Sequence, residues 1–130
     1  VNAVHWPGQG GRGYYFVLMT RDDFIRDRPL AAERLLRALI DAEEYAAGHT
    51  AEAQAFIASR LGYDRALLAS LWAKCDFRVR LDQDLLILME DEARWAVRRR
   101  GLRRETPNYL DVIRWELLEK VRPGAITAIH

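Results

Sequence analysis

The 130-residue sequence contains one cysteine, three histidines and almost no charge imbalance. A single thiol, Cys75, excludes an internal disulfide and a cysteine-based metal cluster. Twenty basic and 19 acidic residues give a formal net charge of +1, so no whole-chain field attracts nucleic acid or an acidic membrane surface. No apolar run approaches the roughly 20 residues that span a bilayer. Half of the residues are hydrophobic, which is typical of a packed globule.

The usual side chains of catalysis are scarce or poorly placed. The histidines His5, His49 and His130 are far apart, and none stands at ligand spacing from another histidine or from the cysteine. Cys75 follows an apolar helix face, which predicts a buried and unreactive thiol. No serine lies in a glycine-flanked nucleophile motif. The sequence therefore predicts a protein that is not an enzyme and has neither a catalytic residue nor a metal or other cofactor.

The strongest pattern is PLAAERLLRALIDAEEYAAG, over Pro29–Gly48, which predicts one long helix. Proline is tolerated in the first helical turn, and Gly48 supplies the stop. Large apolar residues recur at three- and four-residue steps and form one stripe, which also contains Glu43. Such a stripe needs an apolar partner. The candidate is YYFVLM, at 14–19, whose unbroken apolar character predicts a strand over 14–20 that is buried on both faces.

Further helices are expected after the long one. Thr50 is a suitable cap for a helix at 51–61 that ends at Gly62, and Asp64 for a helix at 65–74. An extended stretch at 77–81 precedes a helix at 82–100, in which Glu90 and Arg94 stand at pairing distance. Thr106 and a following proline indicate another helix start, with Tyr109 on its apolar face. The segments 77–81 and 125–129 are weak candidates for strands that pair with 14–19.

Four residues at the start of the chain are candidate ligand contacts. Residues 1–13 contain four glycines and predict a connector or hinge arm, because the GQGGRG run lacks the Lys-Ser/Thr pair of a phosphate loop. Trp6 lies in this arm, while Arg12, Tyr14 and Tyr15 stand where it enters the expected strand. Ligand crevices usually lie at the opposite, carboxyl ends of parallel strands, but a hinge position offers another route to a ligand.

The charge cluster at 98–104 contains five arginines. It could hold a phosphate or a nucleic-acid backbone. Cations in the last turn of a helix also complement its dipole on a solvated face, and no aromatic residues interleave with these arginines. The solvated helix end is the favoured interpretation, and no nucleic-acid partner is expected.

The order of the elements resembles a known family. A YYFVLMTRDDF segment, a proline-initiated helix, HTAEAQAFIASRLGYD, F-x-V-x-LDQDLL, a Trp-bearing helix, TPNYLDVI and VRPGAI follow one another. This order is similar to the C-terminal part of the solute-binding proteins of ABC importers for nitrate, taurine, aliphatic sulfonates and thiamine-pyrimidine precursors. The resemblance covers residues 14–126, and the positions that carry it are Phe24, Pro29, Leu36, Ala42, Glu52, Ala53, Leu81, Asp82, Trp95 and Pro107.

The resemblance implies an α/β fragment of a type II periplasmic-binding-protein-like fold, in which one buried strand (14–20) is covered by a train of five to six helices. Residues 14–130 would be the C-terminal portion of a solute-binding lobe that is normally exported to the periplasm or another extracytoplasmic space. Its partners would be a small anionic or heterocyclic solute and an ABC permease. The start at Val1, without an initiator Met or a signal peptide, predicts an internal cut. The isolated fragment would form a homo-oligomer. The alternative is a helical sensor or protein-interaction domain built on the same scaffold.

Overall fold

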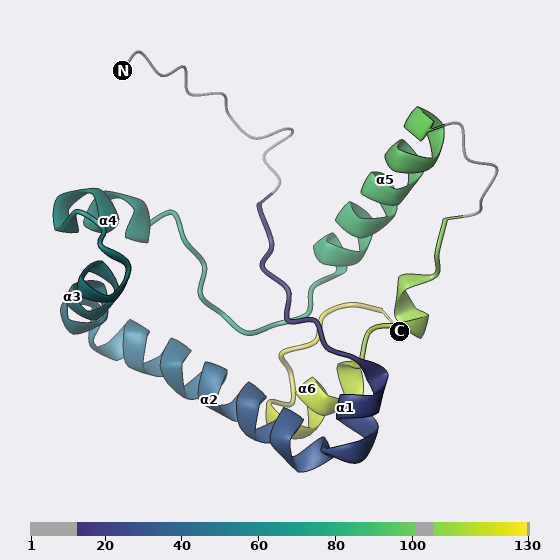
Figure 1. Cartoon of the computed structure of the whole chain (residues 1–130), viewed down its shortest axis with the longest axis horizontal. Helices are drawn as coiled ribbons and strands as arrows, with labels where there is room; N and C mark the ends of the chain where they lie inside the picture. The colour runs from purple at the N-terminus through teal and green to yellow at the C-terminus, as the bar shows by residue number, and fades with distance from the viewer. Residues whose placement is uncertain (1–12, 101–105, 130) are drawn as a thin grey trace.

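The structure, a computed structural model, describes residues 13–100 and 106–129. The described parts of the chain are helical, with six α-helices and one short 3-10 helix (Figure 1). In chain order these are α1 (Asp22–Asp27), α2 (Pro29–Gly48), α3 (Thr50–Leu61), α4 (Arg65–Trp72), α5 (Gln83–Arg100), η2 (Tyr109–Asp111) and α6 (Trp115–Val121). No helix among them combines the length and the hydropathy required to cross a bilayer.

The helices are arranged in an open way (Figure 1). α2 is the long axis, with α3 and α4 folded at its C-terminal end and α1 and α6 packed against it. An extended connection, residues 73–82, returns from α4 to the middle of the molecule, and α5 then projects away from α2. Only η2 packs closely against α5 among the described helices.

The prediction for the long helix is confirmed at both ends. Pro29 occupies the first turn of α2, and the N–H of His49 closes the last turn by donating to the carbonyl of Tyr45 at 2.8 Å. The stripe is only partly buried, with Ala32 and Ile40 inside. Leu35 and Leu39 are 41% and 39% exposed. The buried face of α2 is therefore narrower than the apolar pattern predicts.

Short-range signals also fix the ends of α3 and α4. Gly62 ends α3 with φ +70°, a left-handed conformation that glycine adopts without steric strain. The Asp64 carboxylate caps α4, accepting a hydrogen bond from the N–H of Leu67 at 2.8 Å. Thr50 does not cap α3, because its hydroxyl donates to the carbonyl of Ala46 at 3.1 Å. The helix predicted to start after Thr106 is reduced to η2 and a separate α6.

The core of the described chain is small and lies where α5 begins, beside α6 and the C-terminal tail. Its buried members are Leu81, Leu86, Leu118 and Ala128. Backbone hydrogen bonds of Leu81 join this core to the tail. Its N–H donates to the carbonyl of Ala125, and its carbonyl accepts from the N–H of Thr127, each at 2.9 Å. These bonds form an isolated parallel bridge between Leu81 and Ile126. The two weak strand candidates therefore touch each other rather than residues 14–19.

The prediction of a buried strand at 14–20 is wrong. Residues 13–20 are extended, but no hydrogen bond joins their backbone to another described segment. Tyr14 is 89% and Met19 84% exposed, and Phe16 is fully exposed. The apolar run predicted burial, whereas the described chain offers no sheet in which such a strand could be buried.

The predicted fold class is corrected accordingly. The described residues contain no strand and no sheet, so the α/β, type II periplasmic-binding-protein-like fold is not found. The physical reason is that a sheet needs paired strands, and the 77–81 and 125–129 segments pair at one residue each. The arm at 1–13 lies outside the described residues except for Gly13. The lobe assigned to 14–130 stays a prediction.

Candidate ligand-binding site

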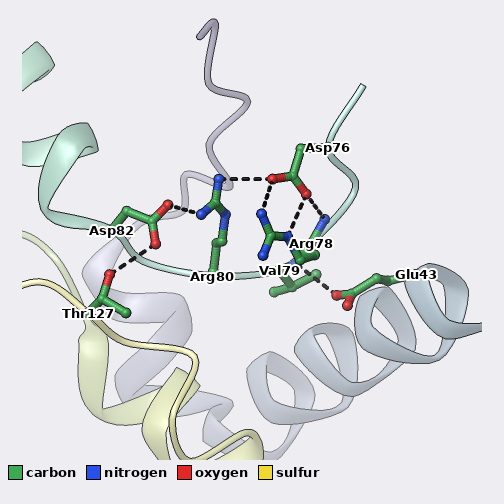
Figure 2. A network of polar contacts seen from close by, with 7 residues as sticks. All are labelled: Glu43, Asp76, Arg78, Val79, Arg80, Asp82 and Thr127. Carbon is green, nitrogen blue, oxygen red and sulfur yellow. Dashed lines mark hydrogen bonds and ion pairs between the residues drawn. The ribbon is translucent and has the colours of Figure 1, made fainter. Parts of the chain in front are cut away.

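Two pockets and one polar network are the features of the described chain that could carry function. The network begins at Glu43, the one acidic member of the α2 stripe. Its Oε2 accepts a hydrogen bond from the N–H of Val79 at 2.7 Å. The same oxygen accepts a hydrogen bond from Nη1 of Arg122 at 2.6 Å, which makes an ion pair. Figure 2 shows the first of these contacts, from α2 to the 73–82 connection. Glu43 thereby ties α2, this connection and the end of α6 together.

Asp76 is the second centre of the network. Its carboxylate accepts hydrogen bonds from Arg78 Nη2 at 2.7 Å and from Arg80 Nη2 at 2.9 Å (Figure 2). Hydrogen bonds from Arg78 are the main reason that the pKa of Asp76 lies well below its usual value. Arg80 also pairs with Asp82, which accepts a further hydrogen bond from the hydroxyl of Thr127 at 3.1 Å. These contacts hold the connection in an extended form.

A pocket of about 300 Å³ lies over this network. Its lining includes three arginines, Arg78, Arg80 and Arg122, which could suit an anion. Each of them is already paired with a carboxylate of Asp76, Asp82, Glu43 or Glu44. An anion would have to displace these carboxylates. We therefore interpret the pocket as the surface of a structural clamp, by which we mean the polar network centred on Glu43 and Asp76.

The other pocket, of about 310 Å³, is the candidate ligand-binding site. It lies between the extended 14–17 segment, the first half of α5 and η2. Its walls are mainly aromatic and apolar, with one carboxylate at the edge, and its lining residues are Tyr14, Tyr15, Val17, Leu85, Leu88, Met89, Glu92 and Tyr109. Apolar walls with few polar groups are typical of small-molecule sites. The volume lies at the lower end of the range for such sites, which favours a small solute.

The four predicted ligand contacts have different outcomes. Tyr14 and Tyr15 line the candidate pocket. Trp6 and Arg12 lie outside the described residues. Tyr15 is half-buried, whereas Tyr14 stands at the rim and is largely exposed. The structure thus brings the two tyrosines to one pocket, although not through the strand geometry from which they were predicted.

The remaining lining residues were not predicted as ligand contacts. Tyr109 was predicted on the apolar face of a helix, and apolar residues with helical periodicity, such as those at the start of α5, are usually packed in a core. Glu92 is the third residue of an acidic run, Glu90-Asp91-Glu92, on α5. Only the tertiary approach of residues 14–17 to α5 and η2 makes these side chains a site. A hint was available in Leu85–Met89, which is apolar all round and too broad for a single packed face.

Other predicted features are also placed by the structure. Cys75 is exposed, so the prediction of a buried thiol is wrong; it lies just beyond α4 rather than on a packed face. Arg98 and Arg99 are exposed at the end of α5, and the rest of the arginine cluster lies outside the described side chains. In the parts of the chain that the structure describes, no three acidic, histidine or cysteine side chains are grouped as a metal site would require.

Comparison of the chain with known proteins gives no match. No family model, no curated protein and no solved structure is significantly similar to it.

Proposed function

We propose that the chain is a non-catalytic portion of a solute-binding protein and that the tyrosine-lined pocket forms part of its ligand site. The observation that carries the proposal is the convergence of Tyr14, Tyr15 and Tyr109 on one pocket. These residues come from opposite ends of the described chain. The sequence resemblance supports the same class of function, and it adds an ABC permease as the partner that receives the solute outside the cytoplasm. The α/β fold is not part of the proposal.

The pocket also favours binding over catalysis. The lining residues that the structure describes include no histidine, cysteine, serine or lysine and a single carboxylate. General acid–base or nucleophilic chemistry needs an activated group with a partner in hydrogen-bond reach. Aromatic and thioether groups such as those of Tyr15, Tyr109 and Met89 contribute contact area and polarizability instead. We therefore expect reversible binding of an unmodified solute.

The test is solution NMR of the labelled chain with a panel of single solutes: nitrate, taurine, 4-aminopyrimidine and choline. We expect at least one uncharged or cationic solute to shift the methyl signals of Leu85, Leu88 and Met89 in a saturable way. Tyr109→Ala should abolish the shifts, while Tyr63→Ala, a matched change at an exposed tyrosine outside the pocket, should leave them unchanged. Failure of the entire panel to shift these methyls at 10 mM, taken as roughly the weakest useful affinity, would refute the proposal.

Nitrate and taurine serve as negative probes in the same experiment. Nitrate and the sulfonate group of taurine are negatively charged, and no basic side chain among the described lining residues would pair with them. A solute-binding site also gains burial from a second wall, which this open pocket lacks. We therefore expect no binding of either solute to the chain alone, and calorimetry is the measurement that checks this.

A second candidate is a helical sensor or protein-interaction domain. The observation in its favour is that several large apolar side chains are left exposed on α3, on α4 and in the connection after α4, namely Phe56, Leu61, Leu67, Leu71 and Phe77. Such a group is typical of a surface that another polypeptide covers. The genes next to the coding sequence discriminate between the candidates: importer permease and ATPase genes support solute uptake, and a fused or adjacent kinase supports sensing.

A further inference from the structure

Among the described residues that line the candidate pocket, Glu92 carries the one formal charge. α5 carries the acidic run Glu90, Asp91 and Glu92. Arg94 pairs with the first two of these carboxylates. Glu92, which lines the pocket, has no ion pair or hydrogen bond with any described side chain. The described part of the lining therefore carries a net negative charge next to aromatic walls.

Tyrosine rings are negative over their faces, and they attract cations that approach within about 6 Å of the ring centre. Three tyrosines line this small pocket, namely Tyr15, Tyr109 and, at its exposed rim, Tyr14. Met89 adds a polarizable sulfur, and Leu85 and Leu88 add apolar surface. Rings and apolar walls with one carboxylate at the edge suit a cation whose charge is spread over carbon-bearing groups.

We propose that this pocket binds a small organic ammonium ion, with the methylated nitrogen among the three tyrosines and Glu92 supplying the counter-charge. The inference rests on the proposed solute-binding function and specifies its ligand class. It replaces the anionic or heterocyclic solute expected from the resemblance.

Competing ligands fit the pocket less well. An anion would meet Glu92, and none of the described lining residues is a basic side chain that could pair with it. A divalent metal ion needs several oxygen or nitrogen ligands, and one carboxylate does not supply them. A neutral apolar solute would leave the charge of Glu92 unused. A quaternary ammonium keeps its favourable contact with the rings without requiring the hydrogen bonds that a primary amine loses on leaving water.

The decisive comparison uses choline and 3,3-dimethylbutan-1-ol, which have the same shape and differ in the charge at one central atom. In NMR titrations of the full chain we expect choline to bind at least about 5-fold more tightly than the neutral alcohol, since cation–π and ionic attraction act only on choline. Equal affinities, with both probes shifting the methyls of Leu85, Leu88 and Met89, would overturn the cation inference and leave the proposed function standing. No shift with either probe would overturn the cation inference, and only failure of the whole solute panel would overturn the proposed function as well.

Substitutions then separate the two sources of attraction. Glu92→Gln should weaken choline binding about 3- to 10-fold and leave the neutral alcohol unchanged, because the carboxylate acts through charge. Glu116→Gln is the matched control, since it removes the same charge from an exposed position on α6 outside the pocket. Tyr109→Leu keeps an apolar wall and should remove most of the preference for choline. An unchanged preference in both Glu92→Gln and Tyr109→Leu would refute the assignment.

The same headgroup chemistry is available from a lipid. Vesicles of phosphatidylcholine are therefore included as a competitor of free choline. Loss of the choline shifts on addition of vesicles would assign the pocket to a lipid headgroup. Unchanged shifts assign it to a free solute, which is the result we expect for a pocket of about 310 Å³ that is partly lined by α5 and η2.

Discussion

Replacing Glu43 tests whether the structural clamp, the polar network centred on Glu43 and Asp76, holds the open helical arrangement together. Glu43 is only 15% exposed, and it serves two elements at once, the N–H of Val79 and the guanidinium of Arg122. Glu43→Ala would leave the N–H of Val79 without its acceptor in a half-buried place, and Arg122 would keep only Glu44 as an ion-pair partner among the described residues. Glu44 provides the matched control, since it pairs with the same Arg122 at 3.0 Å but is 68% exposed.

The expected magnitudes follow from burial. A hydrogen bond to a charged group contributes about 1.5–3 kcal/mol when it is shielded from water, and an exposed ion pair contributes about 0–1 kcal/mol. Glu43 accepts the hydrogen bond of Val79 and pairs with Arg122, and both side chains of that ion pair are partly buried. We expect Glu43→Ala to lower the free energy of unfolding by about 2–3 kcal/mol and Glu44→Ala by less than about 0.5 kcal/mol. Glu43→Gln keeps an acceptor for Val79 and should fall between them.

The assay is urea unfolding of the full chain followed by far-UV circular dichroism at pH 7, with the three variants and Arg122→Met. In a double-mutant cycle, Glu43→Ala and Arg122→Met should show a coupling of about 1 kcal/mol or more, as expected for residues in contact. Equal losses for Glu43→Ala and Glu44→Ala, or a coupling near zero, would show that the clamp contributes nothing to stability.

Three further predictions concern a turn, a titration and assembly. Gly62→Ala should lower stability by about 1 kcal/mol in urea unfolding, because its φ of +70° is strained for a residue with a Cβ, while Gly48→Ala, at the helical end of α2, should not. The pKa of Asp76 is lowered below 3.8 in the folded state, so its contribution to stability is complete above about pH 4 and decreases as the pH falls through the folded pKa; Asp76→Asn should remove this part of the pH dependence, and equal acid profiles would contradict it. The exposed apolar run at 14–19 should recruit a second copy, so light scattering at tens of micromolar should give about twice the 15.1 kDa chain mass, and a monomer would contradict this.

The local parts of this fold were predictable from the sequence because their causes are local. Pro29 and Gly48 bound α2, Gly62 ends α3 and Asp64 caps α4, each through a backbone or side-chain effect that acts over a few residues. The i, i+4 pair of Glu90 and Arg94 on α5 belongs to the same class, and the structure confirms it.

The failed predictions concern segments whose state depends on a partner. The apolar composition of 14–19 indicates that burial of this segment would be favourable. It does not indicate whether the chain forms a sheet in which the segment could be buried. The pairing of Leu81 with Ile126 likewise depends on where the chain returns after α5 and α6, which no local pattern specifies. The tendency of a segment to be buried can therefore be predicted from its own sequence. The segment against which it packs depends on the tertiary structure.

Glu43 and Glu92 show what the position of a charged residue in the sequence predicts about tertiary contacts, and what it does not. Glu43 stands on the apolar stripe of α2, so the sequence alone requires donors for it from elsewhere in the chain, although it does not identify Val79 and Arg122. Glu92 is the converse case. Arg94 pairs with Glu90 and Asp91, which leaves the third carboxylate of the run without a local cation. A carboxylate that is left over in this way is only a surface charge until aromatic side chains gather beside it, and the folding of residues 14–17 against α5 and η2 provides that condition.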